Sequence, residues 1–435
     1  MLETLKNAWR VKELRNKILF TILIIVIFRI GSVIPVPFIN PDVIVEGIQS
    51  GNEFLNYLSI LTGGRLEYGA IFALSITPYI NSSIIIQLLC VAIPYLERLS
   101  KEGEEGQKKL ATITRYTTVG LAVVQGIAYF IYLSETNSLT VNKTGHLWFA
   151  GFVIVLTLAA GSAVVMWLGE QIDVKGIGNG ISVLLFAGIL SRGPQAFGAL
   201  WTYWTEYKRY FAVIGIIIAF LLVIAFIVWM THAERRIPVQ YAKRVVGNKM
   251  YGGQNTHIPI KVNMSGVMPV IFASSILMLP TMVLSFTNTQ SVDKLGNLNL
   301  PFWKDAFMLF STQGVFYAVI YFVMIIAFAY FYATIQFNPV EMANNLRKNG
   351  GAVPGIRPGK PTSDFISKIL SRITLMGALF LSVIAILPII IGNVGNMQGI
   401  TLGGTSVLIM VGVALDTVNN LESQMMMRHY KGFLD

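Results

Sequence analysis

The recurrence of long apolar segments constrains this chain more than any other feature of its sequence. We count ten such segments, at residues 18–36, 70–93, 111–133, 148–168, 177–197, 211–231, 265–286, 313–335, 369–391 and 402–421. Each is close to the roughly 20 apolar residues that a helix needs to cross a bilayer. Only 13% of the 435 residues are charged, whereas about a quarter are charged in soluble domains. The sequence therefore predicts an all-α polytopic membrane protein with ten transmembrane helices.

The distribution of basic residues predicts the orientation of these spans. The chain has 33 Lys and Arg residues against 22 Asp and Glu residues. If the N-terminus is cytoplasmic, most of the basic residues fall in the inner loops and tails. The outer segments then hold only Arg65, Lys143, Arg192, Lys208, Arg209, Lys294 and Lys304. Because inner loops carry the excess of Lys and Arg, we expect both termini to be cytoplasmic.

The spans divide the chain into two halves of five. We expect a cytoplasmic amphipathic N-terminus at 1–17, a first half at 18–197, a second half at 198–421 and a cytoplasmic tail at 422–435. Two inverted five-helix repeats are a common design in transporters. A small-solute secondary transporter with such repeats is therefore one functional hypothesis, although the spans contain few of the charged residues that usually mark ion coupling.

Two long cytoplasmic loops stand out by their composition. In the loop at about 232–264, strand-like alternation flanks a glycine-rich centre, which predicts a protruding hairpin. The loop at about 337–368 contains the string GAVPGIRPGKPT, and its prolines and glycines predict a non-helical structure. Both loops are strongly basic.

Sequence signatures of catalysis are missing. The four histidines are scattered without metal-ligand spacing, and the chain contains no HExxH, GxSxG or CxxC motif. The string GIGNG at 176–180 differs from a dinucleotide-binding GxGxxG, and we interpret it as a flexible helix start. We expect no enzyme activity, no cofactor and no metal site.

Several long strings are spread over nearly the whole chain: VFRIGSVIPVPFIN, ITPYINSSIIIQLL, EGEEGQKK, WLGEQIDVKGIGNGIS, ERRIPVQYAKR, THIPIKVNMSGVMPVIFASSI, FNPVEMANNLRKNGGAVPGIRPGKPT and GGTSVLIMVGVALD. In sequence and in order they resemble the SecY/Sec61-alpha family of protein-translocation channels, in its bacterial branch. The resemblance implies two pseudo-symmetric five-helix halves around a central pore in the cytoplasmic (inner) membrane. It implies a channel that passes unfolded preproteins and releases hydrophobic segments laterally into lipid.

The resemblance also implies a constriction in the middle of the pore. Matched motif by motif, the family's ring of aliphatic residues falls on Ile76, Ile80, Ile181, Leu185, Ile271 and Ile409. An apolar ring resists ion flow because it disfavours a continuous file of water. By residue type alone, each of these side chains would be interpreted as ordinary packing or as facing lipid.

Two further features follow from the same resemblance. A plug that closes the pore from outside falls on about 56–68, with Leu58, Ile60, Leu61, Gly63, Gly64, Arg65 and Tyr68. A lateral gate falls between the spans at 70–93 and 265–286, where the polar candidates are Gln87, Gln125, Asn263, Ser274 and Ser275. Without the resemblance, the first would be an outer loop and the second a set of interhelical hydrogen bonds.

The resemblance implies several partners. These are the membrane subunits SecE and SecG, the motor ATPase SecA, the ribosome, and signal peptides and nascent chains. Partner docking falls on the basic loops at Arg235, Arg236, Arg244, Lys249 and Arg357, whose charges suit ribosomal RNA phosphates. The same charges also suit anionic lipids.

Overall fold

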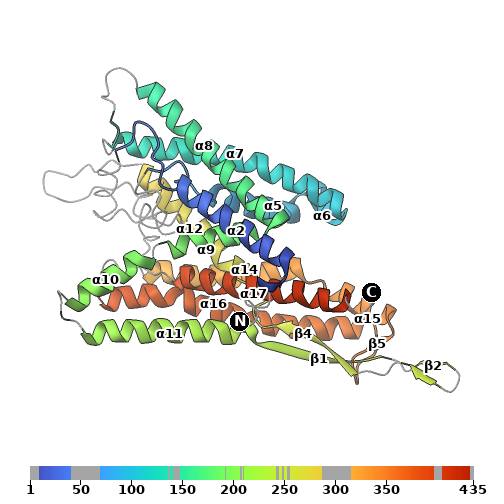
Figure 1. Cartoon of the computed structure of the whole chain (residues 1–435). Coiled ribbons are helices and arrows are strands. Elements are labelled where there is room, and N and C mark those ends of the chain that lie inside the picture. Colours follow the sequence, from blue (N-terminus) through green and yellow to red (C-terminus); the bar gives the residue numbers. More distant parts are fainter. Residues whose placement is uncertain are drawn as a thin grey trace.

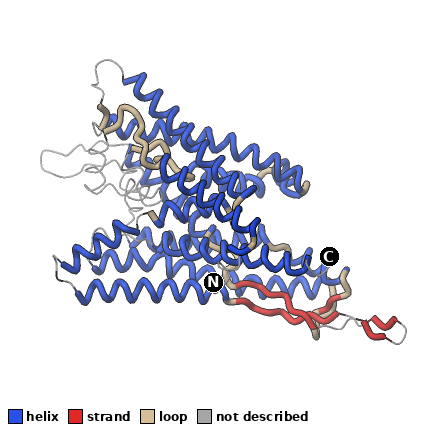
Figure 2. The backbone as a smooth tube through the Cα atoms, viewed as in Figure 1, coloured by secondary structure: helices blue, strands red, loops and turns tan. Residues whose placement is uncertain are grey.

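The computed structural model describes most of the chain. The described residues are 9–40, 69–135, 138–140, 147–191, 193–205, 208, 210–241, 244–246, 249–251, 255–286, 315–395 and 404–431. Helices make up most of this part of the chain, and strands form one projecting feature (Figure 2). The fold class is therefore mostly helical, and the prediction of an all-α chain needs that correction.

Each of the ten predicted apolar segments contains a helix. The helices of the first half are α2 (Lys12–Gly31), α5 (Thr77–Ala92), α6 (Pro94–Lys101), α7 (Glu104–Glu135), α8 (Leu147–Lys175), α9 (Gly180–Leu190) and α10 (Gly193–Thr205). The helices of the second half are α11 (Tyr210–His232), α12 (Met268–Phe286), α14 (Val315–Gln336), α15 (Pro339–Lys348), α16 (Lys360–Gly395) and α17 (Gly404–Lys431).

Length and composition identify several membrane spans in the described part of the chain. Among the described residues, four helical stretches are long and apolar enough to cross a membrane: Leu147–Lys175, Val213–His232, Phe316–Lys348 and Lys360–Leu387. The bent pair of α5 and α6 would make a fifth. By these criteria the chain is a multi-pass membrane protein, and the count of ten spans stays a prediction.

The bend between α5 and α6 has a local cause. The two helices meet at 103°. Ile93, which separates them, has extended backbone angles (φ −108°, ψ 114°) and precedes Pro94. A residue before proline is pushed out of the helical region, and proline is well suited to the first turn of the next helix. The predicted span at 70–93 therefore ends sharply, and α6 leaves in a new direction.

The helices form two groups that meet at α9 and α12. In the first group α2 and α7 pack against α8, and α5 packs against α7. In the second group α16 packs against α14 and α17, and α11 packs against α17. Figure 1 shows these groups as two layers, with α9 and α12 drawn between them. Since α9 contacts both α8 and α17, and α12 contacts both α7 and α14, these two helices join the halves.

The predicted cytoplasmic hairpin is present. Strand β1 (Glu234–Tyr241) pairs antiparallel with β4 (Asn255–Lys261), and β2 (Arg244–Val246) pairs with β3 (Lys249–Tyr251) nearer the tip. Strand β5 (Gly351–Ala352), from the second basic loop, pairs with the end of β1. The sheet order is therefore β4-β1-β5, and the hairpin projects from one end of the molecule (Figure 1).

An apolar cluster fixes the hairpin to the helices. Ile237 and Ile260 point to one face of the sheet and pack with Val353, Ile366 and Leu370. Because alternate residues of a strand face opposite sides, the neighbouring residues of β1 stay exposed. The two basic loops are therefore one folded unit seated on the start of α16.

The second basic loop is partly helical, contrary to the prediction for 337–368. Asn338 begins α15, and its side-chain Oδ1 accepts hydrogen bonds from the amides of Val340 and Glu341. Pro339 occupies the first helical position, and Lys348 lies in the last turn, where a cation is favourable. Most of the glycines and prolines that suggested a non-helical loop lie between α15 and α16, and Pro361 lies in the first turn of α16.

Candidate functional site

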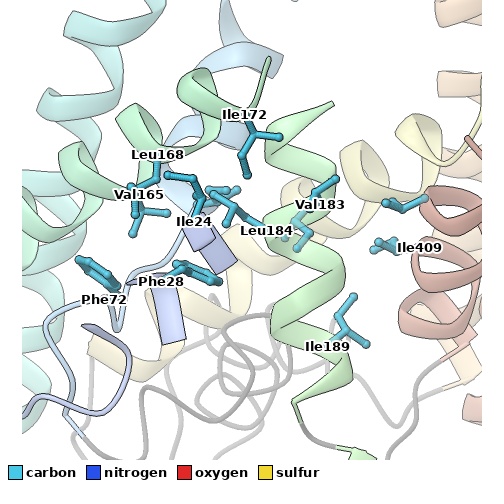
Figure 3. Packing of buried hydrophobic residues seen from close by; sticks show 13 residues of the cluster. Ile24, Phe28, Phe72, Val165, Leu168, Ile172, Val183, Leu184, Ile189 and Ile409 are labelled. Atoms are coloured by element: carbon cyan, nitrogen blue, oxygen red, sulfur yellow. The ribbon is translucent and has the colours of Figure 1, made fainter. Parts of the chain in front are cut away.

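The six aliphatic residues predicted to form a ring lie in one apolar cluster. We call these six residues the collar. Ile76, Leu185 and Ile409 are buried members of the cluster, and Ile80, Ile181 and Ile271 are partly buried residues packed against it. Figure 3 shows this region from close by, with Val183 and Leu184 of α9 and Ile409 of α17 among its side chains.

The collar is built where helices begin. Ile76 immediately precedes α5, and its carbonyl accepts the amide of Ile80, so the two side chains are one turn apart. Ile181 and Leu185 lie in the first two turns of α9, Ile271 in the first turn of α12 and Ile409 in the second turn of α17. Four helix starts, two from each half of the chain, therefore meet in one place.

Aromatic side chains that the sequence analysis did not single out support the collar. The rings of Phe28 and Phe72 stack with their centroids 6.1 Å apart, and both belong to the same cluster. Gly31 lies so close to the Phe72 ring that a Cβ atom there would overlap it. Phe28 and Gly31 both belong to the FRIG string, and both lie against the Phe72 ring. This shared contact is a physical reason why the two residues occur together in the string.

Charged groups near the collar lie on α7 and α8. Arg115 Nε and Glu170 Oε1 are 2.6 Å apart and join α7 to α8. Further along α8, the Asp173 Oδ1 atom accepts the backbone amide of Gly180 at 2.7 Å.

The GIGNG turn is tightly packed, which corrects its interpretation as a flexible helix start. A Cβ atom on Gly176 would lie 2.7 Å from both the Ile172 carbonyl oxygen and Thr21 Oγ1. The amide of Ile177 donates to Thr21 Oγ1 at 3.2 Å. Asn179 caps α9, because its Oδ1 accepts the amide of Ser182 at 3.1 Å.

Two of the gate candidates make hydrogen bonds within their own helices. Gln87 Nε2 contacts Ser83 Oγ at 3.5 Å within α5. The buried Ser274 hydroxyl donates to the carbonyl of Ile271, one turn earlier in α12. Gln125 and Ser275 are half-buried on α7 and α12.

Asn263 lies apart from the other gate candidates, before α12 begins. Its Oδ1 atom is buried and has no hydrogen-bond partner in the described part of the chain. A Cβ atom on Gly377 would lie 3.7 Å from its Cα, so α16 is its close neighbour. The structure thus brings Asn263 to α16, while Ile80 of α5 and Ile271 of α12 both pack against the same apolar cluster.

The docking candidates lie on the two joined basic loops. Arg235 and Arg236 are exposed on β1, and Arg236 Nε pairs with Glu234 Oε1 at 2.6 Å. Arg357 is exposed in the segment between β5 and α16, and its carbonyl accepts the hydroxyl of Thr362 at 2.8 Å. Arg244 begins β2 and Lys249 begins β3, towards the tip of the hairpin.

The plug candidates fall on a part of the chain that the structure does not describe. Leu58, Ile60, Leu61, Gly63, Gly64, Arg65 and Tyr68 all lie outside the described residues. The described chain resumes at Gly69, which has φ +54° and whose carbonyl accepts the amide of Val36. The plug therefore stays a prediction.

Comparisons with known proteins agree with this arrangement. The SecY family profile matches residues 70–418. The protein translocase subunit SecY of Bacillus subtilis (strain 168) is 43% identical over 445 residues, and that of Streptomyces scabiei is 42% identical over 454 residues. In both cases the match covers 100% of each chain.

Solved structures share the fold at low sequence identity. A structure described as that of a protein conducting channel has a TM-score of 0.60 at 17% identity, covering 94% of this chain and 92% of the other. Sec61 in the canine ribosome–channel complex has a TM-score of 0.56 at 16% identity, with the same coverages. The chain belongs to the SecY family, the non-enzymatic channel subunits of the protein translocase.

Proposed function

We propose that the collar is the seal through which this protein translocase subunit passes unfolded polypeptides. The observation that carries the proposal is the meeting of four helix starts in one apolar cluster. Side chains at helix starts move when those helices shift, so a constriction built from four of them can widen without unfolding any helix. The collar joins both halves of the chain, because α5 and α9 belong to the first half and α12 and α17 to the second.

The chemistry of the collar suits this task. Aliphatic side chains offer no hydrogen bonds to water, so a narrow ring of them dewets and blocks ions. Their contacts with a moving polypeptide are non-directional, so residues of many kinds can pass at similar cost. A solute transporter would instead need polar groups that recognise its substrate, whereas all six collar residues are aliphatic.

The remaining features extend the proposal. Ten spans in two pseudo-symmetric halves would surround the pore in the cytoplasmic (inner) membrane, with both termini cytoplasmic. The segment at about 56–68 would close the outer side, and α5 and α12 would part to release hydrophobic segments into lipid. The positive-inside distribution of Lys and Arg supports this orientation.

Partner docking completes the proposal. SecE and SecG would be the membrane partners, and SecA or the ribosome would bind the joined cytoplasmic loops. Exposed Arg235 and Arg357 support this, because they lie on one folded unit that projects from the helices. Anionic lipids are a further partner for the same charges. Signal peptides and nascent chains would enter between α5 and α12.

A reconstitution experiment tests the proposed function. The full chain, purified with its membrane subunits, is placed in vesicles and supplied with a preprotein and a motor ATPase. We expect import of the preprotein that depends on ATP and on the motor. Ion-driven uptake of small solutes by the chain without a motor, together with no preprotein import, would overturn the proposal in favour of a transporter.

A further inference from the structure

The turn between α8 and α9, residues 176–179, is held by three other parts of the chain. On one side, Thr21 of α2 accepts the amide of Ile177 through Oγ1. On the α8 side, Asp173 Oδ1 accepts the amide of Gly180, the first residue of α9. On the third side, Thr417 of α17 lies against Gly178, since a Cβ atom there would be 3.4 Å from Thr417 Oγ1. The turn therefore contacts α2, α8 and α17 together.

Glycine is required at several positions for this packing. Gly178 has φ +76°, a left-handed backbone conformation that side chains with a Cβ rarely adopt. A Cβ atom on Gly180 would overlap the carbonyl oxygen of Gly169 in α8. Gly169 in turn lets Ile181 approach, with the Ile181 Cγ1 atom 3.3 Å from its ideal Cβ position. The start of α9 is thus pressed directly onto α8.

The side chain of Ile177 anchors the turn in a second apolar cluster. Ile177 is buried with Leu14 of α2 and Leu421 of α17. Lys17 of α2 also donates to Gln424 Oε1 of α17 at 3.2 Å. Ile409 belongs to the same helix as Leu421. The contact between Ile177 and Leu421 therefore helps to set how α9 lies relative to α17. Collar residues on both helices are therefore located relative to the same turn.

We propose that Thr21 and Asp173 are positioning residues that set Ile181 and Leu185 in the collar. Ile181 directly follows Gly180, whose amide Asp173 binds, and Leu185 lies one turn further along α9. A carboxylate is also favourable at the start of a helix, where the backbone amides lack partners within the helix. Neither is one of the six collar residues, and each accepts a backbone amide at the turn or at the start of α9, so both act through the turn. The inference rests on the proposed function of the collar.

Two matched pairs of variants test the inference in the full chain purified with its membrane subunits. Thr21→Val removes the acceptor at nearly constant shape, and Thr21→Ser keeps it. Asp173→Ala removes the acceptor, and Asp173→Asn keeps an oxygen that can accept the Gly180 amide. Asp364→Ala, at an exposed carboxylate of α16, is the matched control. Ile181→Asn alters the collar directly. The measurement is resting ion conductance in planar bilayers, with the melting temperature recorded in parallel.

We expect Thr21→Val and Asp173→Ala to raise the resting conductance by about tenfold, as expected when one hydrogen bond that favours the closed arrangement is lost. Thr21→Ser, Asp173→Asn and Asp364→Ala should conduct like the unmodified channel. The inference is overturned if Ile181→Asn leaks while Thr21→Val and Asp173→Ala do not. It is also overturned if Thr21→Ser leaks as much as Thr21→Val and Asp173→Asn leaks as much as Asp173→Ala. If Ile181→Asn itself stays tight, the proposed function of the collar fails first.

Discussion

Gly377 of α16 packs directly against the backbone of Val262, the residue that follows β4. A Cβ atom on Gly377 would lie 2.5 Å from the Val262 carbonyl oxygen. Val262 begins the link between the β1–β4 hairpin and α12, which carries Ile271 of the collar. The docking loops and one collar helix are therefore joined by a short segment that lies against α16.

Replacing Gly377 should loosen this junction. We expect Gly377→Ala to lower the free energy of unfolding by about 1–3 kcal/mol, because the added methyl group meets backbone that cannot easily move. Gly120 of α7 is the matched control, since a Cβ atom there meets nothing within 4 Å. Gly120→Ala should be neutral or stabilising by about 0.5–1 kcal/mol. Thermal unfolding in detergent measures both, and equal melting temperatures for the two variants would contradict the packing described here.

A polar group in the collar should let ions through. We expect Ile409→Asn to raise resting conductance by about tenfold or more, because the amide stabilises water in the constriction. Ile217 of α11, whose side chain is exposed on the outside of the helix bundle, is the control, and Ile217→Asn should leave conductance unchanged. Single-channel recording in planar bilayers makes the measurement. A tight Ile409→Asn channel would count against the collar as the seal.

Reversing the charge of Arg357 should impair docking without unfolding the protein. Arg357 is exposed between β5 and α16. We expect Arg357→Glu to reduce motor-driven preprotein import by about tenfold and to weaken the salt dependence of motor binding, since one favourable charge contact is lost. Lys348→Glu, at another exposed basic position on α15, should have a smaller effect. Import at the unmodified level by the Arg357→Glu channel would contradict the assignment.

Reversing both charges of the ion pair between α7 and α8 should restore most of the stability that is lost when one charge is reversed. Arg115 and Glu170 are 49% and 26% exposed, so solvent screens their attraction. We therefore expect Arg115→Glu to cost only about 1 kcal/mol of unfolding free energy, most of it repulsion from Glu170. The double variant Arg115→Glu, Glu170→Arg should recover most of that loss. A double-mutant cycle on melting temperature gives the coupling, and additive losses would show that the pair does not interact.

Much of the local structure follows from patterns in the sequence. The ten apolar segments each contain a helix, because a long apolar run in a bilayer must satisfy its backbone hydrogen bonds internally. The alternation around Ile237 and Ile260 correctly predicts the hairpin, since one face of the sheet is buried and the other is not. The sequence also contains the start of α15, with Asn338 and Pro339 in the order that begins a helix. The glycines and prolines later in that loop obscured this signal.

The start of α5 could not be predicted from the local pattern. The apolar run begins at Ala70, but α5 starts only at Thr77, after a series of turns that brings Phe72 against Phe28. The residues of these turns are as apolar as those of the helix, so hydropathy does not separate the two. The contact between Phe72 and Gly31 requires a partner from α2, which the sequence near Phe72 does not contain.

By itself, the sequence determined which long apolar segments contain helices, which loops are basic and which motifs are typical of the family. Only the tertiary structure decided that the six collar residues share one cluster, that β5 joins the two basic loops, and that the GIGNG turn is pressed against α2 and α17. The physical reason is that helix formation depends on neighbours along the chain. The meeting of Ile76 with Ile409, in contrast, depends on how whole helices pack, and a single segment does not encode that packing.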